Sequence, residues 1–343
     1  MASTPTLDSD MQALLDRLAA YQAPAIISVC PRIARLLPTL ANAAQDFNAE
    51  HVAARLKAVA APMPTPVGAI VHALIPGPES ELVARIYIPE GNGPFPVVVY
   101  FHGGGWVIAN LDTYESSCRA LTVGGPFVVI SVGYRQAPEH RFPAPVHDAV
   151  AALTWARTHA ASYKGDVNRI AVAGESAGGN LATTACLVLR DRHLPLPAFQ
   201  LLVYPVTNHA FDTPSYRENA HAKPLNAAMM PWFWNHYLGE NGDGDSPLAS
   251  PLRAPDLSGL PPALIITAQF DPLRDEGEAY GARLQRAGVP TRVVRYDGVS
   301  HEFFGAAGIV AQGTKAVAEA VSALNHAFSG AAADQPQYEV VHS

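Results

Sequence analysis

The clearest pattern along the chain is a series of short apolar runs that alternate with stretches of helical periodicity. Eight runs have the length and β-branched content of strands. They are VGAIVHAL, VARIYIP, PVVVYFH, FVVISVGY, RIAVAG, AFQLLVYP, PALIITAQF and TRVVRYD. From Pro96 onward the runs are almost continuously apolar, as expected for strands that helices cover on both faces of a mostly parallel sheet. The pattern predicts an α/β fold.

Two segments interrupt this alternation. Residues 1–60 show helical patterns without a strand, and residues 206–250 separate two strands without a simple crossover helix. We expect both to form one helical cap over a core made of residues 61–205 and 251–329, and we expect residues 330–343 to be a loose tail. Within the core, helices are predicted over 145–158, 178–192, 276–287 and 314–328.

Composition narrows the class of protein. The 343 residues are 49% hydrophobic and 15% charged, which describes a compact globular chain, and the length favours a main domain with a smaller appendage. With a net charge of −7 and no basic run, the sequence gives no reason to expect a nucleic acid or an anionic membrane as partner.

The cysteines and the N-terminus indicate the cellular compartment in which the protein is expected. Cys30, Cys118 and Cys186 are widely spaced and odd in number, which favours a reducing environment. The first residues lack the basic and apolar regions of a signal peptide. The longest weakly polar stretch, Ala120–Tyr134, is shorter than the roughly 20 residues of a membrane helix. We therefore expect a cytoplasmic protein.

A serine stands at the junction of a predicted strand and a predicted helix. The pentapeptide 174–178, GESAG, matches the pattern Gly-x-Ser-x-Gly. Glycines flank Ser176 because a tight strand-to-helix turn leaves no room for side chains, and the turn exposes the serine hydroxyl at the edge of the sheet. The helix start directs free backbone N–H groups to the same place. The pattern predicts a nucleophile, whereas a glycine-rich turn without chemistry is the alternative.

A second glycine-rich segment precedes this serine. The segment HGGGW, residues 102–106, ends a predicted strand and resembles the loop that supplies the other half of an oxyanion hole. We predict the N–H groups of Gly104, Gly105 and Ala177 as the donors. His102 is expected to hold the loop rather than to react.

A serine nucleophile of this kind needs a histidine and an acid, in the chain order serine, acid, histidine. Asp271 directly follows the run PALIITAQF, and His301 follows the run that begins with TRVVRYD. Both therefore fall at strand ends on the same edge as Ser176. Asp275 and Glu276 are alternative acids, but their position at a helix start favours a stabilising role there. We predict the triad Ser176, Asp271 and His301.

The sequence resembles the hormone-sensitive-lipase-like family of α/β-hydrolase carboxylesterases. The resemblance runs from about Val83 to Phe328 and rests on HGGGW, YRQAPEHRFPAPVHD, GESAGGNLA, DPLRDEGEAY and SHEFF. It implies hydrolysis of short to medium carboxylic esters through an acyl-enzyme, no cofactor, a cap built from the N-terminal helices and the insert after the sixth strand, and the ability to form a homodimer.

The sequence also departs from that family. Glu175 stands where many relatives have aspartate, and Glu302 follows the histidine where many have glycine. These two positions put the substrate preference in doubt. Glu139 and Asp148 belong to a shared motif and are expected to brace loops near the site.

Aromatic and methionine side chains supply candidates for the substrate pocket. We single out Trp106, Met230 and Trp234, because adaptable methionine and broad aromatic rings suit apolar ester groups. A place in the core of the cap is the alternative for each of them. The wider set comes from one helical patch: Met229, Met230, Trp232, Phe233, Trp234 and Tyr237.

Other functions stay open at this point. The same triad would serve an amidase or a lactonase. A non-catalytic small-molecule receptor on this fold is a further alternative, although the presence of all three triad residues argues against it. The sequence has neither HExxH nor GxGxxG after a strand, so no metal or dinucleotide is expected.

Overall fold

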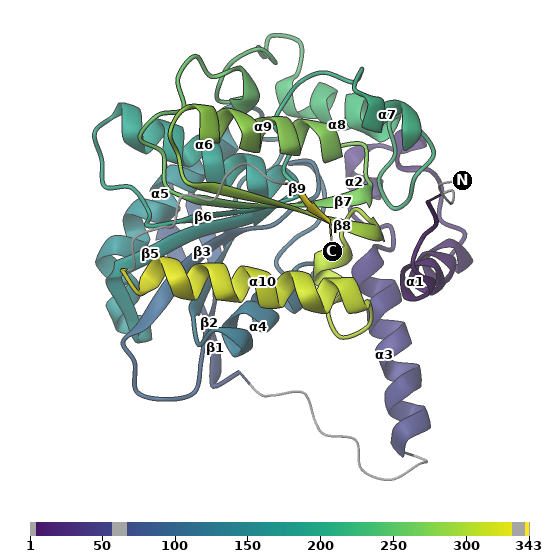
Figure 1. Cartoon of the computed structure of the whole chain (residues 1–343), viewed down its shortest axis with the longest axis horizontal. Coiled ribbons are helices and arrows are strands. Elements are labelled where there is room, and N and C mark those ends of the chain that lie inside the picture. Colours follow the sequence, from purple (N-terminus) through teal and green to yellow (C-terminus); the bar gives the residue numbers. More distant parts are fainter. Residues whose placement is uncertain (1–4, 57–66, 331–339, 343) are drawn as a thin grey trace.

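The computed structural model describes residues 5–56, 67–330 and 340–342 (Figure 1). Within them one sheet has the strand order β1-β2-β4-β3-β5-β6-β7-β8-β9. Strand β2 runs antiparallel to β1 and β4, and every other neighbouring pair is parallel. The strands are β1 (Ala69–Pro76), β2 (Glu81–Ile88), β3 (Phe95–Phe101), β4 (Val128–Gly133), β5 (Gly165–Glu175), β6 (Gln200–Val203), β7 (Ala263–Phe270), β8 (Thr291–Ser300) and β9 (Val340–His342).

All eight predicted strands are present, so the α/β prediction is confirmed. Strand β9 was not predicted. It pairs with β8 from Val293 to Arg295, so the expectation of a loose tail was wrong for residues 340–342. Three residues are too few to produce a strand pattern in the sequence, and β9 is defined by its partner instead.

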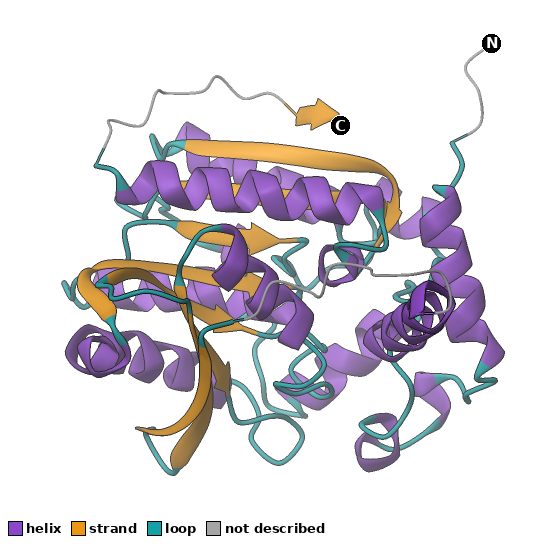
Figure 2. Ribbon diagram, turned by 90° about the horizontal axis from the view of Figure 1, so that it is seen from below, coloured by secondary structure: helices purple, strands orange, loops and turns teal. Residues whose placement is uncertain are grey.

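Helices cover both faces of the sheet. Figure 1 shows α6 and α9 on one side of the strands and α10 with α4 on the other, and Figure 2 shows the same layers from below. The helices of the core are α4 (Glu115–Gly124), α5 (Ala144–His159), α6 (Ala177–Asp191), α9 (Arg274–Arg286) and α10 (Ala311–Phe328), with short 3-10 helices η2 (Ala160–Tyr163), η3 (Pro251–Arg253) and η4 (Phe303–Ala306). Each face buries its own apolar cluster.

The local sequence explains why these elements form. Strand β3 is buried from Val97 to Phe101, which accounts for its unbroken apolar sequence. Helix α10 buries Ala316, Ala320 and Leu324, which are spaced by four residues and so form one stripe along the helix. None of the helices in the described ranges has the length and hydropathy to cross a membrane.

The two predicted cap segments are helical. The first contains α1 (Ser9–Ala20), η1 (Ile26–Ser28), α2 (Pro31–Ala34) and α3 (Leu40–Leu56), and the second contains α7 (Pro214–Glu218) and α8 (Met229–Leu238). Helix α8 contacts η1, so the segments meet although about 200 residues separate them in the sequence. Residues 1–4 and 57–60 of the first predicted segment lie outside the described residues. That the two segments act as one cap stays a prediction.

Candidate active site

Ser176 occupies a sharp turn between β5 and α6. Its backbone has φ 58° and ψ −119°, a strained conformation for a residue with a side chain. A Cβ on Gly174 would collide with the carbonyl of Gly178, and a Cβ on Gly178 would collide with the carbonyl of Phe101. The two glycines are therefore required by close backbone approach, as the sequence pattern indicated.

Ser176, His301 and Asp271 form a continuous hydrogen-bonded chain. The Nε2 atom of His301 lies 3.0 Å from the Oγ atom of Ser176, and Nδ1 lies 2.6 Å from Oδ2 of Asp271. With its proton on Nδ1, the imidazole donates to Asp271 and can accept the serine proton at Nε2. The structure thus brings together the three residues predicted as a triad, at the carboxyl ends of β5, β7 and β8.

The environment of His301 raises its pKa above the ordinary value of 6.5. Burial favours the neutral ring and lowers the pKa, but the charge of Asp271 and its hydrogen bond outweigh that effect, with smaller contributions from Glu302 and Glu175. Ser176 and His301 are 5% and 4% exposed. The pair therefore lies in a site with little bulk water.

The glycine loop after β3 lies beside the serine. Gly104 and Gly105 have φ of 98° and 57°, and a Cβ on Gly105 would collide with the ring of Phe233 from α8. In the part of the chain that the structure describes, no hydrogen bond is donated by the N–H of Gly104, Gly105 or Ala177. These amides are the predicted oxyanion donors, and their unused hydrogen-bonding capacity is compatible with that role.

The side chain of His102 points into the loop rather than to the serine. Its Nδ1 lies 2.7 Å from the carbonyl oxygen of Gly103, and its ring stacks on Tyr134 at 4.4 Å. Burial lowers its pKa to about 4, so the ring is neutral at physiological pH. His102 holds the loop, as expected from the sequence.

Glu175 is a buried carboxylate directly before the nucleophile. It accepts hydrogen bonds from the hydroxyls of Tyr100 and Tyr204, and burial raises its pKa. The Tyr204 ring lies 4.4 Å from the His301 ring. Sequence reasoning missed both tyrosines, although Tyr204 directly follows the short strand β6 and so lies at the same sheet edge as the triad.

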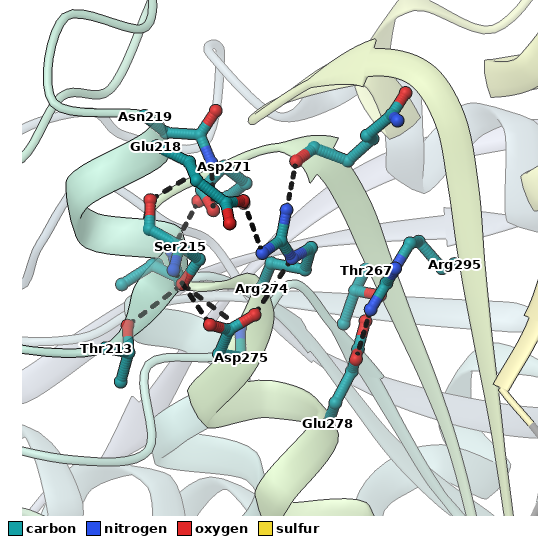
Figure 3. A network of polar contacts seen from close by, with 12 residues as sticks. Thr213, Ser215, Glu218, Asn219, Thr267, Asp271, Arg274, Asp275, Glu278 and Arg295 are labelled. Atoms are coloured by element: carbon teal, nitrogen blue, oxygen red, sulfur yellow. Dashed lines mark hydrogen bonds and ion pairs between the residues drawn. The ribbon is translucent and has the colours of Figure 1, made fainter. Parts of the chain in front are cut away.

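The carboxyl groups after β7 have separate partners. Asp271 accepts from the N–H of Leu273 at 2.8 Å, which fixes its second oxygen toward His301. Asp275 accepts from the N–H of Ser215 at 2.8 Å and pairs with Arg274 at 2.9 Å (Figure 3). Ser215 lies in α7, so Asp275 ties the insertion to the core.

Glu276, the other alternative acid, also holds the insertion. It accepts from the N–H groups of Thr207 and Asn208 at 2.7 and 3.2 Å. Burial raises its pKa to about 8. Among the described hydrogen bonds and ion pairs neither Asp275 nor Glu276 contacts His301, so Asp271 is the acid that holds the imidazole.

The two acids of the shared motif brace loops, as expected. Asp148 accepts three hydrogen bonds from the Arg135 side chain and one from its backbone N–H. Glu139 pairs with Arg35, whose hydrogen bond lowers its pKa to about 2. Arg35 also donates to the carbonyl of Val107 at 2.8 Å, so it joins α2 to the end of the glycine loop. Nothing in the local sequence indicated Arg35.

The three predicted pocket residues lie in the core, Met230 and Trp234 on the buried face of α8 and Trp106 packed against that face. Trp106 and Trp234 are fully buried and Met230 is 2% exposed. Trp106 stacks on Tyr237 at 4.0 Å, and the Trp234 ring lies 4.8 Å from that of Trp106. Their part in substrate binding stays a prediction, and the packing favours the alternative of a structural role.

A cleft of about 390 Å³ lies between the N-terminal helices and the insertion. Three of its lining residues belong to segments that carry the site. Glu302 directly follows His301, Ile108 ends the glycine loop, and Met229 begins α8. Most of the remaining lining is apolar and comes from residues 18–40. The cleft is therefore our candidate for the substrate pocket.

Known proteins resemble this chain in sequence. A family model described as alpha/beta hydrolase fold matches residues 98–305. Esterase LipI of Mycobacterium tuberculosis is 40% identical over 289 residues, which cover 83% of this chain and 90% of the relative. An arylesterase of Saccharolobus solfataricus is 40% identical over 243 residues, covering 70% of this chain and 78% of the relative.

Solved structures resemble the fold as well. An ester hydrolase from the metagenome of Lake Arreo, complexed with a bipyridine phosphonate derivative, has a TM-score of 0.82 and 38% identity, over 94% of this chain and 100% of that one. An esterase of Pyrobaculum calidifontis has a TM-score of 0.79 and 36% identity, over 93% and 98%. This chain therefore belongs to the alpha/beta-hydrolase family, in its hormone-sensitive-lipase-like branch of carboxylic ester hydrolases.

Proposed function

We propose that this protein is a serine carboxylesterase that hydrolyses small-molecule esters with short to medium acyl chains. The observation that carries the proposal is the hydrogen-bonded chain from Ser176 through His301 to Asp271, near the amides of Gly104, Gly105 and Ala177, which donate no hydrogen bond among the described residues. The names of the relatives, which are esterases and carboxylic ester hydrolases, support the same reaction class.

The proposed reaction has two halves. As the Oγ atom of Ser176 attacks the ester carbonyl, His301 takes the serine proton at Nε2 and Asp271 stabilises the imidazolium. The amides of Gly104, Gly105 and Ala177 bind the tetrahedral oxyanion. His301 then gives the proton to the leaving alcohol. Water repeats the sequence on the acyl-enzyme and releases the acid. No step calls for a cofactor.

The competing activities use the same groups. An amidase must protonate a poorer leaving group, and a lactonase must admit a cyclic ester, so the substrate and not the triad distinguishes them. Hydrolysis of matched 4-nitrophenyl butyrate, butyryl-4-nitroanilide and γ-butyrolactone by one preparation decides among them. We expect the ester to be hydrolysed fastest. A faster rate on the anilide or lactone would assign the other activity.

A further proposal concerns the location of the protein in the cell. A cytoplasmic location is supported by the three cysteines, none of which forms a disulfide.

A receptor without catalysis is disfavoured, because the complete hydrogen-bonded triad has no use in binding alone. Hydrolysis of any ester that disappears in Ser176→Ala excludes it.

A further inference from the structure

Glu302 lies at a position where the mechanism needs no carboxylate. It directly follows His301, and it is one of the residues that line the cleft between the N-terminal helices and α8. Its backbone φ of 67° lies in the left-handed region that favours glycine. A glutamate held in a conformation better suited to glycine points to a task for the side chain.

The other residues that line the cleft are mostly apolar, so the charge of Glu302 stands out among them. Among the described lining residues, Glu302 is the one acid and Lys223 the one base, and apolar side chains make up most of the remainder. Lys223 lies exposed on the loop before α8, where solvent screens its charge, whereas Glu302 is partly buried. A ligand in the cleft would therefore meet a negative charge on an apolar wall.

The Glu302 carboxylate has unused hydrogen-bonding capacity. Its one hydrogen bond among the described residues comes from the hydroxyl of Tyr114, at the long distance of 3.5 Å. A carboxylate can accept about four hydrogen bonds. Burial raises its pKa, which shows that the anion is poorly solvated where it lies. A cationic group would supply the missing countercharge, and a protonated amine would also supply hydrogen-bond donors.

We propose that Glu302 is a specificity-determining residue that selects esters carrying a cationic group, such as a quaternary or protonated amine, over neutral and anionic esters of the same shape. The inference rests on the proposed esterase function and adds the substrate class. The cation would lie in the cleft beside Glu302 while the ester carbonyl reaches Ser176.

Matched substrates test this proposal on both halves of the ester. On the acyl side, the 4-nitrophenyl ester of 4-(trimethylammonio)butyrate is compared with that of 5,5-dimethylhexanoate, in which carbon replaces the charged nitrogen. On the alcohol side, butyrylcholine is compared with 3,3-dimethylbutyl butyrate. The measured quantity is the ratio of kcat/KM for the cationic ester to kcat/KM for the neutral one, at one pH and ionic strength.

The full-length wild-type protein should prefer the cationic ester in at least one series by roughly fivefold, as expected of one partly screened ion pair. Glu302→Gln and Glu302→Gly should bring that ratio close to one. Each ratio compares two substrates of one variant. A change in the reactivity of His301 or in the amount of folded protein therefore affects both kcat/KM values equally and cancels in the ratio. Glu319→Gln removes a carboxylate from α10, remote from the cleft, and should leave the ratio unchanged.

Each outcome separates the two proposals. If the wild type hydrolyses neither the neutral nor the cationic esters, the proposed function itself fails. If esters are hydrolysed but the ratio does not exceed one in either series, or if Glu302→Gln keeps the wild-type ratio, the esterase stands and the role of Glu302 is overturned. The series that shows the preference identifies which half of the ester occupies the cleft.

Discussion

At the scale of single residues, the site depends on how each side chain is held. The imidazole of His301 has Asp271 on one nitrogen and Ser176 on the other. The sequence predicted these three because each follows an apolar strand and they occur in the required order. It did not predict the hydrogen bonds of Tyr100 and Tyr204 to Glu175, because those partners come from β3 and from the end of β6 and meet only in the folded sheet.

Two neighbouring acids should respond differently to the same substitution. Asp271→Asn removes the group that fixes the imidazole tautomer, so kcat should fall by about 10⁴ with little change in Tm. Asp275→Asn removes the charge that pairs with Arg274 and leaves one acceptor oxygen for the two donors of Ser215 and Arg274, so it should lower the free energy of unfolding by about 1–3 kcal/mol with kcat nearly kept.

Steady-state kinetics and thermal melts on both variants make this comparison. The assignment of the acid would be wrong if Asp275→Asn were the inactive variant and Asp271→Asn kept most of its activity. Asp191→Asn, in an exposed pair at the end of α6, serves as the neutral control.

The pH dependence follows from His301. The ring must be neutral to accept the serine proton, and its pKa is raised above 6.5 because Asp271 outweighs burial. The value of kcat/KM should therefore be low at acid pH and rise through one ionisation with a midpoint above 6.5. A pH series on a neutral ester measures it. A midpoint below 6.5 would show that burial dominates and that Asp271 does not act on the ring as described.

At the scale of elements, the apolar runs predicted all eight strands from β1 to β8, and the buried parallel strands such as β3 stood out because they are apolar along almost their whole length. Helix α4 was not among the predicted helices. It is short, and its buried face consists of Ser117, Cys118, Leu121 and Thr122, so only one strongly apolar side chain marks that face in the sequence. The glycine loop after β3 was predicted from its composition. The contact of Gly105 in this loop with Phe233 of α8 could be found only in the structure.

A substitution at Gly105 tests the predicted catalytic role of the glycine loop. An alanine there would need the left-handed conformation and would displace the Phe233 ring, so Gly105→Ala should lower kcat by about 10²–10³, the typical cost of losing an oxyanion donor. Gly288 also has positive φ, 80°, but a Cβ there meets nothing within 4 Å. Gly288→Ala should cost about 1 kcal/mol of stability and leave kcat unchanged. Equal kinetics for both variants would contradict the role of the loop.

At the scale of the whole molecule, the site lies where the insertion and the N-terminal helices meet the core. Both segments could be recognised in the sequence because they interrupt the alternation of strands and helices. It could not indicate Arg35, which reaches Glu139 across 104 residues of sequence and fastens α2 to the glycine loop. Such pairs leave no local pattern, because the two partners are neighbours only after folding.

As the candidate substrate pocket, the cleft predicts an upper limit on substrate size. Its volume of about 390 Å³ lies at the low end of the range for small-molecule sites. Across 4-nitrophenyl esters from acetate to palmitate, kcat/KM should therefore decline for acyl chains longer than about eight carbons. Rates on palmitate equal to those on butyrate would show that the N-terminal helices and α8 open to admit long chains.

The most direct test of the central claim is covalent labelling of Ser176. A fluorophosphonate should add once per chain, on the peptide that carries Ser176, and activity should fall in proportion to the labelled fraction measured by intact mass. Ser176→Ala should take up no label, keep its Tm and lose about 10⁶ in kcat. Labelling at another residue, or retention of more than about one per cent of the activity in Ser176→Ala, would contradict the assignment of Ser176 as the nucleophile.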